Sequence, residues 1–246
     1  MPFKILHVSP ILHQVVNSAT GKVHANHSVL KNAKAQLRLL RSLEGGAISG
    51  KELKKLTAAS YTKGKERPRQ IGVLVLDSEL TTREAAVYYN PATGEATVTH
   101  RGTQGASDWL NNAALGVGLY KQTGRYQRGK DTQKAVNAKY GKENVLTTSH
   151  SQSGALAHEL NKEGLVNKSI EINPARTPFQ TVMRNETILK SSLDPVSFFV
   201  PKNKNVKVIP ARTYNPLSEH SAKIIRGADA AEIYGAGFEQ IPRRYL

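Results

Sequence analysis

The clearest pattern in the chain is the alternation of short apolar stretches with amphipathic ones over residues 71–209. The run IGVLVLD (71–77) is apolar throughout, which predicts a strand buried on both faces. The stretches AAVYYN (85–90) and EATVTH (95–100) flank the turn Pro91–Gly94 and predict a hairpin. Because strands then alternate with helices, we expect an α/β fold with a mostly parallel central sheet and helices on both faces. Further strands are predicted at 145–149, 169–173, 187–192 and 205–209, and helices at 107–119, 125–140 and 154–163.

The N-terminal part of the chain follows a different pattern. In SVLKNAKAQLRLLRSL (28–43), leucines can share one face of a helix while lysines and arginines recur on another. A second helix is predicted at 49–60, with Ser49 as its N-cap. The polar and basic run 62–70 is typical of a linker or surface loop. We therefore predict a basic helical N-terminal extension (1–60) followed by an α/β domain (61–246).

Composition narrows the classes of protein. Apolar residues make up 39% of the 246, which is enough for a core. No apolar run approaches the roughly 18 residues of a spanning helix, and the N-terminus lacks the cleavage site of a signal peptide, so we expect a soluble protein. The absence of cysteine excludes disulfides, thiolate metal ligands and thiol catalysis. His24 and His27 lack further ligands nearby, so neither a metal nor a cofactor is expected.

The net charge of +16 is unevenly distributed. Residues 1–70 hold 13 of the 35 basic residues but only three of the 19 acidic ones. This asymmetry predicts an anionic partner for the N-terminal arm: nucleic acid, an anionic membrane surface or an acidic protein. Nucleic acid is the weaker of these, because aromatic residues make up only 6% and no binding motif is recognisable.

The stretch VLTTSHSQSGALA (145–157) raises the question of catalysis. A strand that enters a helix through a small-X-Ser-X-small sequence has the layout of a nucleophile elbow, which would expose the hydroxyl of Ser151. The two small positions, usually glycine, hold Ser149 and Ser153 here. The alternative is a serine-rich turn between a strand and a helix, without catalytic meaning.

Two segments taken together resemble the class 3 lipase family of α/β-hydrolases. In that family an RGT-type segment precedes a DWL-like one, and a GHSLGGALA-like elbow follows; here VYYNPATGEATVTHRGTQGASDWL (87–110) and SHSQSGALA (149–157) match. The resemblance covers roughly residues 60–225. It implies an α/β-hydrolase fold, hydrolysis of lipid carboxylic esters such as acylglycerols or phospholipids, and an oxyanion hole formed by Thr103 and the backbone N–H of Gln152.

A serine nucleophile needs a base, which an acid orients, and in this fold the chain order is Ser, acid, His. Only His158 and His220 follow Ser151, and His158 lies in the helix that starts at the elbow, too close to fold back. Asp194 is the only aspartate between Ser151 and His220, and it directly follows a predicted strand. We therefore predict the triad Ser151, Asp194 and His220. Weaker candidates for the acid are Glu171, Glu186 and Glu219.

Other features leave alternatives open. His150 is expected to point to the far side of its strand, and both it and Arg101 to be structural. Residues 104–120 fit either a lid or a core helix. The whole chain fits either a lipase-like enzyme or an inactive hydrolase fold that serves as a basic binding or structural module. Since lipase-like proteins also occur among large DNA viruses, the cytoplasm and a virion are both open as locations.

Overall fold

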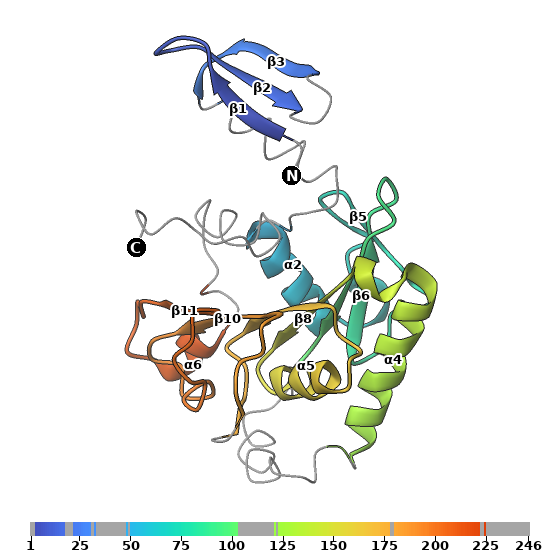
Figure 1. Ribbon diagram of the computed structural model, residues 1–246. Helices are drawn as coiled ribbons and strands as arrows, with labels where there is room; N and C mark the ends of the chain where they lie inside the picture. Colours follow the sequence, from blue (N-terminus) through green and yellow to red (C-terminus); the bar gives the residue numbers. More distant parts are fainter. Residues whose placement is uncertain are drawn as a thin grey trace. The chain divides into compact units, whose positions relative to one another are not determined.

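The computed structural model describes residues 3–17, 22–30, 32, 48, 50–102, 121, 123–177, 180–221 and 224. The chain divides into two units, one within Met1–Gly50 and one spanning Lys51–Arg226, and each is described by itself (Figure 1). The predicted helix 107–119, most of the predicted helix 28–43, and Ser49 lie outside the described residues.

The first unit contains an antiparallel sheet in the order β1-β2-β3. Its strands are β1 (Phe3–His7), β2 (His13–Asn17) and β3 (Val23–Ser28). The predicted helical character is therefore wrong for this stretch. Short, β-branched runs on either side of a turn satisfy their backbone groups by pairing with each other, as Ile5 does with Val15.

The second unit is built on a mixed sheet in the order β11-β10-β9-β8-β7-β6-β5-β4. From β7 to β11 neighbouring strands are parallel, and from β4 to β7 they are antiparallel. The predicted α/β fold with a mostly parallel sheet is thus confirmed. The strands are β4 (Gln70–Ile71), β5 (Leu74–Leu76), β6 (Ala85–Tyr89), β7 (Ala96–His100), β8 (Val145–His150), β9 (Lys168–Ile172), β10 (Glu186–Ser191) and β11 (Val206–Ile209).

The apolar run 71–77 differs from its prediction. It is not one buried strand but part of a tight hairpin between β4 and β5, in which Ile71 pairs with Leu74. Gly72 turns the chain with a φ of +61°, and a Cβ there would lie 2.0 Å from Glu52 Oε1. The apolar composition correctly predicts that part of this run is buried. The left-handed glycine turns the chain, so the run cannot form a single strand. The hairpin of β6 and β7 is confirmed, with Ala85 opposite His100.

Helices lie on both faces of this sheet. Side chains alternate along β8, so Thr147 bonds to Gln133 of α4 (Gly124–Tyr140) while His150 bonds to the last residue of α2 (Gly50–Tyr61). Helix α5 (Ser153–Lys162) packs beside α4 (Figure 1). Residues 51–60, which we assigned to the extension, therefore belong to the second unit.

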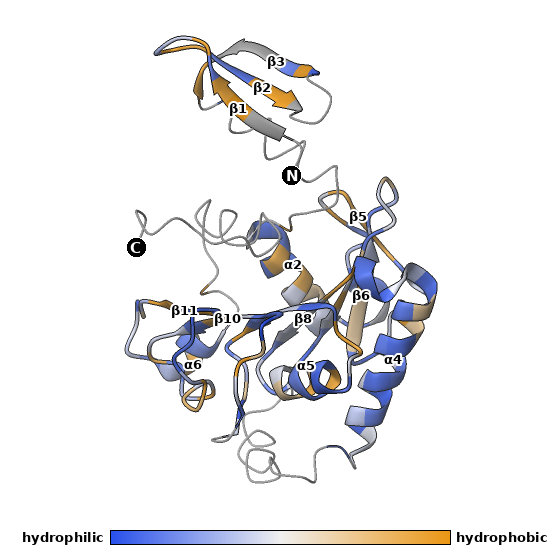
Figure 2. Cartoon of the chain, in the orientation of Figure 1, coloured by the Kyte–Doolittle hydropathy of each residue, from blue (hydrophilic) through white to orange (hydrophobic). Residues whose placement is uncertain are grey.

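The core of the second unit lies between the sheet and these helices. Tyr126 and Val136 of α4 are buried, while most of that helix is hydrophilic (Figure 2). Within the described residues, no helix is long and apolar enough to cross a bilayer. One apolar cluster under α4 comprises Ala85, Val87, Ala96, Val98, Val136 and Val145.

Candidate active site

The turn between β8 and α5 holds Ser151 in an unusual conformation. Its φ is +63°, in the left-handed region that L-residues with a side chain rarely adopt. The backbone fixes this geometry from both sides. The Ser151 N–H donates to the carbonyl of Ile172 at 3.1 Å, and its own carbonyl accepts from the N–H groups of Gly154 and Ala175, both at 2.9 Å. Such strain persists only where its surroundings hold it, and it is typical of functional sites.

Ser153, which stands where the elbow usually has glycine, is fully buried and uses its hydroxyl. The Oγ atom accepts from the N–H of His150 at 3.0 Å and lies 2.7 Å from the carbonyl of His100 and 2.9 Å from that of His150. The hydroxyl therefore bridges the ends of β7 and β8. A glycine could not make this connection, so serine is compatible with a tight elbow at this position.

Two glycines provide the close approaches that the elbow still requires. A Cβ on Gly154 would lie 2.2 Å from the Pro174 Cβ, which no packing tolerates. A Cβ on Gly102 would lie 2.8 Å from the Cβ of Ser151 and 2.8 Å from the carbonyl of His150. Small residues are thus required at Gly154, one position further along α5 than in the usual elbow, and at Gly102, just after β7.

Three side chains from different elements meet at the elbow. The Oγ of Ser151 lies 2.8 Å from Nε2 of His220, and Nδ1 of His220 lies 2.8 Å from Oδ1 of Asp194. Ser151 follows β8, Asp194 follows β10 and His220 ends the short helix α6 (Pro216–His220). Since a carboxylate only accepts, the Nδ1 of His220 carries the proton and Nε2 is free to accept from the serine hydroxyl.

The Asp194 carboxylate is buried and held by its own loop. Its Oδ1 accepts from the N–H of Val196 at 3.2 Å, and its Oδ2 accepts from both the N–H (3.0 Å) and the hydroxyl of Ser197. β10 already ends at Ser191, so the carboxylate lies in the loop that follows the strand. The carboxylate is therefore fixed in orientation before any substrate binds.

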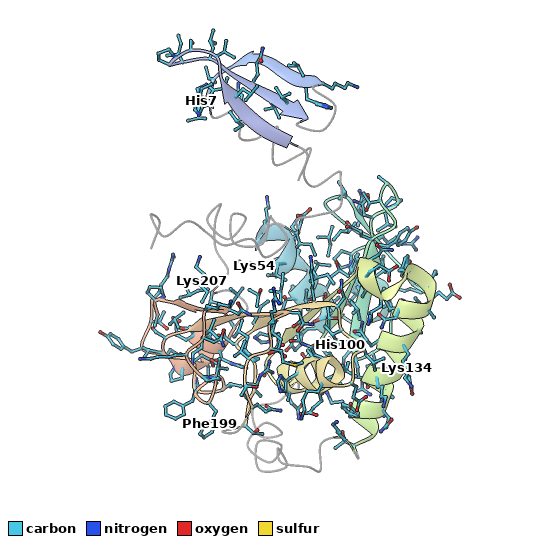
Figure 3. All side chains as sticks on the ribbon, viewed as in Figure 1. His7, Lys54, His100, Lys134, Phe199 and Lys207 are labelled. Carbon is cyan, nitrogen blue, oxygen red and sulfur yellow. The ribbon has the colours of Figure 1, made fainter. Side chains whose placement is uncertain are left out.

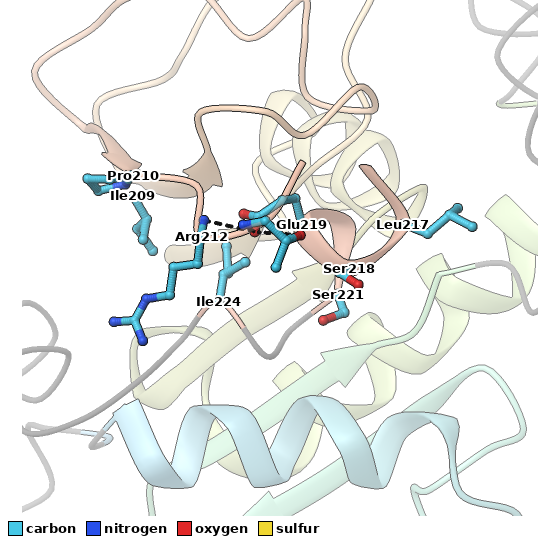
Figure 4. Close-up of a pocket in the computed structure, with 9 residues that line it drawn as sticks. Ile209, Pro210, Arg212, Leu217, Ser218, Glu219, Ser221 and Ile224 are labelled. Carbon is cyan, nitrogen blue, oxygen red and sulfur yellow. Dashed lines mark hydrogen bonds between the residues drawn. The ribbon is translucent and has the colours of Figure 1, made fainter. Parts of the chain in front are cut away.

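Glu219, a weaker candidate for the acid, is turned away from His220. Its carboxylate accepts from the backbone N–H groups of Arg212 and Thr213, both at 3.0 Å (Figure 4). It also accepts from the hydroxyl of Ser191. The hydrogen bonds from Ser191 and the Arg212 backbone lower the pKa of Glu219. These bonds tie α6 to the end of β11 and so position His220. A cavity of about 370 Å³ lies against this helix, lined in part by Ile209, Pro210, Leu217 and Ile224.

His150 lies beside the catalytic candidates, so the expectation that it points to the far side is wrong. Its ring stacks at a tilt against that of His220, with centroids 5.1 Å apart, and its Nε2 lies 2.8 Å from the His220 carbonyl. Its Nδ1 lies 2.7 Å from the hydroxyl of Tyr61, which also accepts from the N–H of Gly102 at 2.9 Å.

The donor and the acceptor of each of these hydrogen bonds follow from the chemistry of the two atoms that it joins. A carbonyl only accepts, so Nε2 of His150 must donate to His220, and in a neutral ring Nδ1 then accepts from Tyr61. Burial lowers the pKa of His150 to about 4 and raises that of Tyr61 to about 12, so both groups are uncharged near neutral pH. We call this chain from Gly102 through Tyr61 and His150 to the His220 backbone the neutral relay.

A charged cluster lies on the other side of the elbow, under α5. Arg176 donates to Glu171 at 2.6 Å and to the carbonyl of Gly154 at 2.6 Å, and it lies 3.4 Å from Glu186. Nδ1 of His158 lies 2.7 Å from Glu186. All four side chains are buried, and burial raises the pKa of Glu171 to about 8. We call Glu171, Arg176, Glu186 and His158 the ion cluster.

The remaining predicted residues have mixed outcomes. Gln152 is buried at the start of α5, where helix N–H groups lack partners within the helix. Arg101 is buried, and its N–H donates to the carbonyl of Glu84 at 3.0 Å, which fits a structural role. Thr103 and residues 104–120 lie outside the described part of the chain. Tyr61 was missed because no local signal links it to His150, 89 positions away.

Comparison with known proteins gives a weak likeness. No protein-family model and no curated protein matches the chain. Among solved structures, the chain is similar to the Lip2 lipase from Yarrowia lipolytica, with a TM-score of 0.39 and 12% identity over 59% of this chain and 72% of that one. It is also similar to the extracellular lipase LipA from Serratia marcescens, with a TM-score of 0.32 and 16% identity over 67% of this chain and 30% of that one. This likeness is too weak to indicate an activity, so the activity is inferred from the residues of this chain.

Proposed function

We propose that the protein is a serine ester hydrolase of the α/β-hydrolase type, acting on carboxylic esters of lipids. The observation that carries this proposal is the continuous hydrogen bonding from Ser151 through His220 to Asp194, with the serine at a φ of +63°. The order of these residues along the chain is also that of an α/β-hydrolase.

In the proposed reaction, the Ser151 oxygen attacks the ester carbonyl while Nε2 of His220 takes the hydroxyl proton. The tetrahedral intermediate collapses to an acyl-serine, and His220 returns the proton to the leaving alcohol. Water then attacks the acyl-serine while Nε2 of His220 takes its proton. Return of this proton to the Ser151 oxygen releases the acid and restores the serine. Asp194 stabilises the imidazolium that forms twice in each cycle.

The oxyanion of each intermediate would be met by the backbone N–H of Gln152, at the N-terminus of α5, and by Thr103. The N-terminus of this ten-residue helix carries a partial positive charge, which favours a developing oxyanion. Loss of one such donor typically lowers turnover by about 10²–10³.

A lipid substrate is supported by apolar side chains on the same segments as the triad. Phe198 and Phe199 follow Asp194 closely and are 76% and 50% exposed, and Leu217, just before His220, is 72% exposed. Phe199 points outward from the sheet (Figure 3). Exposed apolar groups around a site favour a substrate that is itself apolar.

The test is labelling with a fluorophosphonate, followed by mass spectrometry of the peptides, with Ser151→Ala as the matched control. We expect a phosphonyl adduct on Ser151 and none in the variant, because the reagent loses fluoride only to an activated serine. A folded protein that gives no adduct, with or without detergent micelles, would contradict the proposed hydrolase activity. It would favour the inactive hydrolase fold as a basic binding module.

A further inference from the structure

A groove of about 1000 Å³ opens on the β4–β5 side of the second unit, outside the triad. Two segments form its walls: the loop after α2, with the short 3-10 helix η1 (Gly64–Glu66), and residues 75–83. Five basic side chains line it, and no acidic one does. They are Lys63, Lys65, Arg67, Arg69 and Arg83.

Three of the cations in this groove have no acidic partner within the part of the chain that the structure describes. Elsewhere in this unit basic side chains find acidic partners: Lys130 bonds to Glu163 at 2.8 Å and Lys139 to Asp77 at 2.9 Å. Lys63, Lys65 and Arg69, by contrast, are exposed and form no ion pair with any described residue. Concentrated charge of one sign in a concave site attracts a ligand of the opposite sign.

Arg67 gives the groove a fixed shape. It is buried, and its guanidinium donates to the carbonyls of Ala59 (3.0 Å) and Thr62 (3.2 Å) at the end of α2 and to that of Thr82 (3.0 Å) on the opposite wall. One side chain thus joins the two walls, which is the preorganisation that a binding site needs.

The lining indicates what kind of anion fits. Besides the cations it offers the hydroxyls of Ser78 and Thr82, while that of Thr81 is bonded to the Val87 backbone. Lysine, arginine and hydroxyl donors together are the groups that proteins use for phosphate oxygens. No aromatic side chain lines the groove to stack on a base, so the lining does not favour single-stranded nucleic acid.

We propose that this groove is a binding site for phosphate groups, presented by phospholipid head groups or by a soluble phosphate compound. The proposal does not depend on ester hydrolysis. The sequence predicts an anionic partner for the N-terminal arm. The proposal instead assigns anion binding to the second unit, which carries the triad and contains Lys63, Lys65 and Arg69.

The test compares the full chain with the triple variant Lys63→Gln, Lys65→Gln, Arg69→Gln. The matched control, Lys134→Gln, Lys202→Gln, Arg184→Gln, removes the same charges from exposed positions outside the groove. Binding is measured by co-sedimentation with vesicles of phosphatidylcholine alone and of phosphatidylcholine with phosphatidic acid. Calorimetry with inorganic phosphate and with glycerol 3-phosphate measures the soluble source. Circular dichroism and thermal unfolding check the fold of each variant.

We expect the groove variant to bind phosphatidic acid vesicles roughly a hundredfold more weakly, at about a fivefold loss for each of the three cations, and the control to lose little. Loss confined to the vesicles assigns the site to lipid, and loss that extends to the soluble phosphates assigns it to a soluble ligand. The proposal would be overturned by equal loss in both variants, or by a wild type that binds neither the phosphatidic acid vesicles nor the soluble phosphates. So would tight binding of a single-stranded oligonucleotide that depends on these residues while vesicles are ignored.

Discussion

The two sides of the elbow are stabilised in opposite ways. On the α2 side, the neutral relay joins Tyr61 and His150 to the backbone of His220 through uncharged groups. On the α5 side, the ion cluster holds the first turn of the helix through Arg176. Apart from the Asp194 carboxylate, the side chains that support the candidate base are therefore uncharged, and the ion cluster lies on the other side of the elbow. The relay therefore positions the His220 backbone, while the ion cluster fixes the start of α5.

Removing the cation of the ion cluster is expected to have the largest effect. Arg176→Met leaves Glu171 and Glu186 buried without their guanidinium, and this should lower the free energy of unfolding by about 3–5 kcal/mol. Urea unfolding measures it. The matched control is Arg128→Met, which breaks the exposed ion pair with Glu84 and should cost less than about 1 kcal/mol. Similar losses in both variants would contradict the distinction.

The ion cluster should also make stability depend on pH. Burial raises the pKa of Glu171 to about 8, while the unfolded chain releases this proton at a pKa near 4.5. The folded state therefore holds the proton through this window, and the free energy of unfolding falls as the pH rises from about 5 to about 8. The slope contributed by this group is at most about 1.4 kcal/mol per pH unit.

Urea unfolding across this pH range measures the effect, with Glu171→Gln as the comparison. The variant cannot ionise at this position, so its stability should change less with pH than that of the wild type. Arg176 contacts the Glu171 carboxylate, Glu186 contacts Arg176, and His158 contacts Glu186, and all three remain in both proteins. Parallel curves for the two proteins would show that Glu171 does not titrate in this window.

Breaking the neutral relay should have the smallest effect of these changes, a moderate loss of turnover. Tyr61→Phe leaves the N–H of Gly102 and Nδ1 of His150 without a partner, which loosens the support of His220. We expect kcat for a soluble ester to fall about tenfold, with KM little changed. Tyr140→Phe removes a hydroxyl bonded to Asp77 and serves as the control. If the two variants lose kcat equally, the relay has no special role.

The elbow and the three residues that meet there could be predicted because each lies at the end of an element in a fixed chain order. The serine turn, the Asp-Pro after a strand and the late histidine are local signals. The support around them could not be predicted. Tyr61 and His150 come together only through the packing of α2 against β8, and the bond from Arg176 to Gly154 depends on the turn after β9.

Errors in the fold prediction have local physical causes. The run 71–77 has the composition of a buried strand, and its single glycine gives no sign that it adopts a left-handed conformation there. In the first unit the basic pattern of residues 28–43 favours a helix, whereas β1 to β3 are short strands, with Val15 and Val16 of β2 buried. Short apolar segments do not distinguish strand from helix by their period alone.

The hydroxyl of Ser153 links the elbow to the order in which the chain can fold. It bonds to the carbonyl of His100, a residue 53 positions earlier, so the turn acquires its geometry only when β7 and β8 are already paired. A contact of this sequence separation forms late, after the loop between the strands has closed. An unfolded or half-folded chain then presents an ordinary serine, so the proposed fluorophosphonate labelling of Ser151 would report only completely folded molecules.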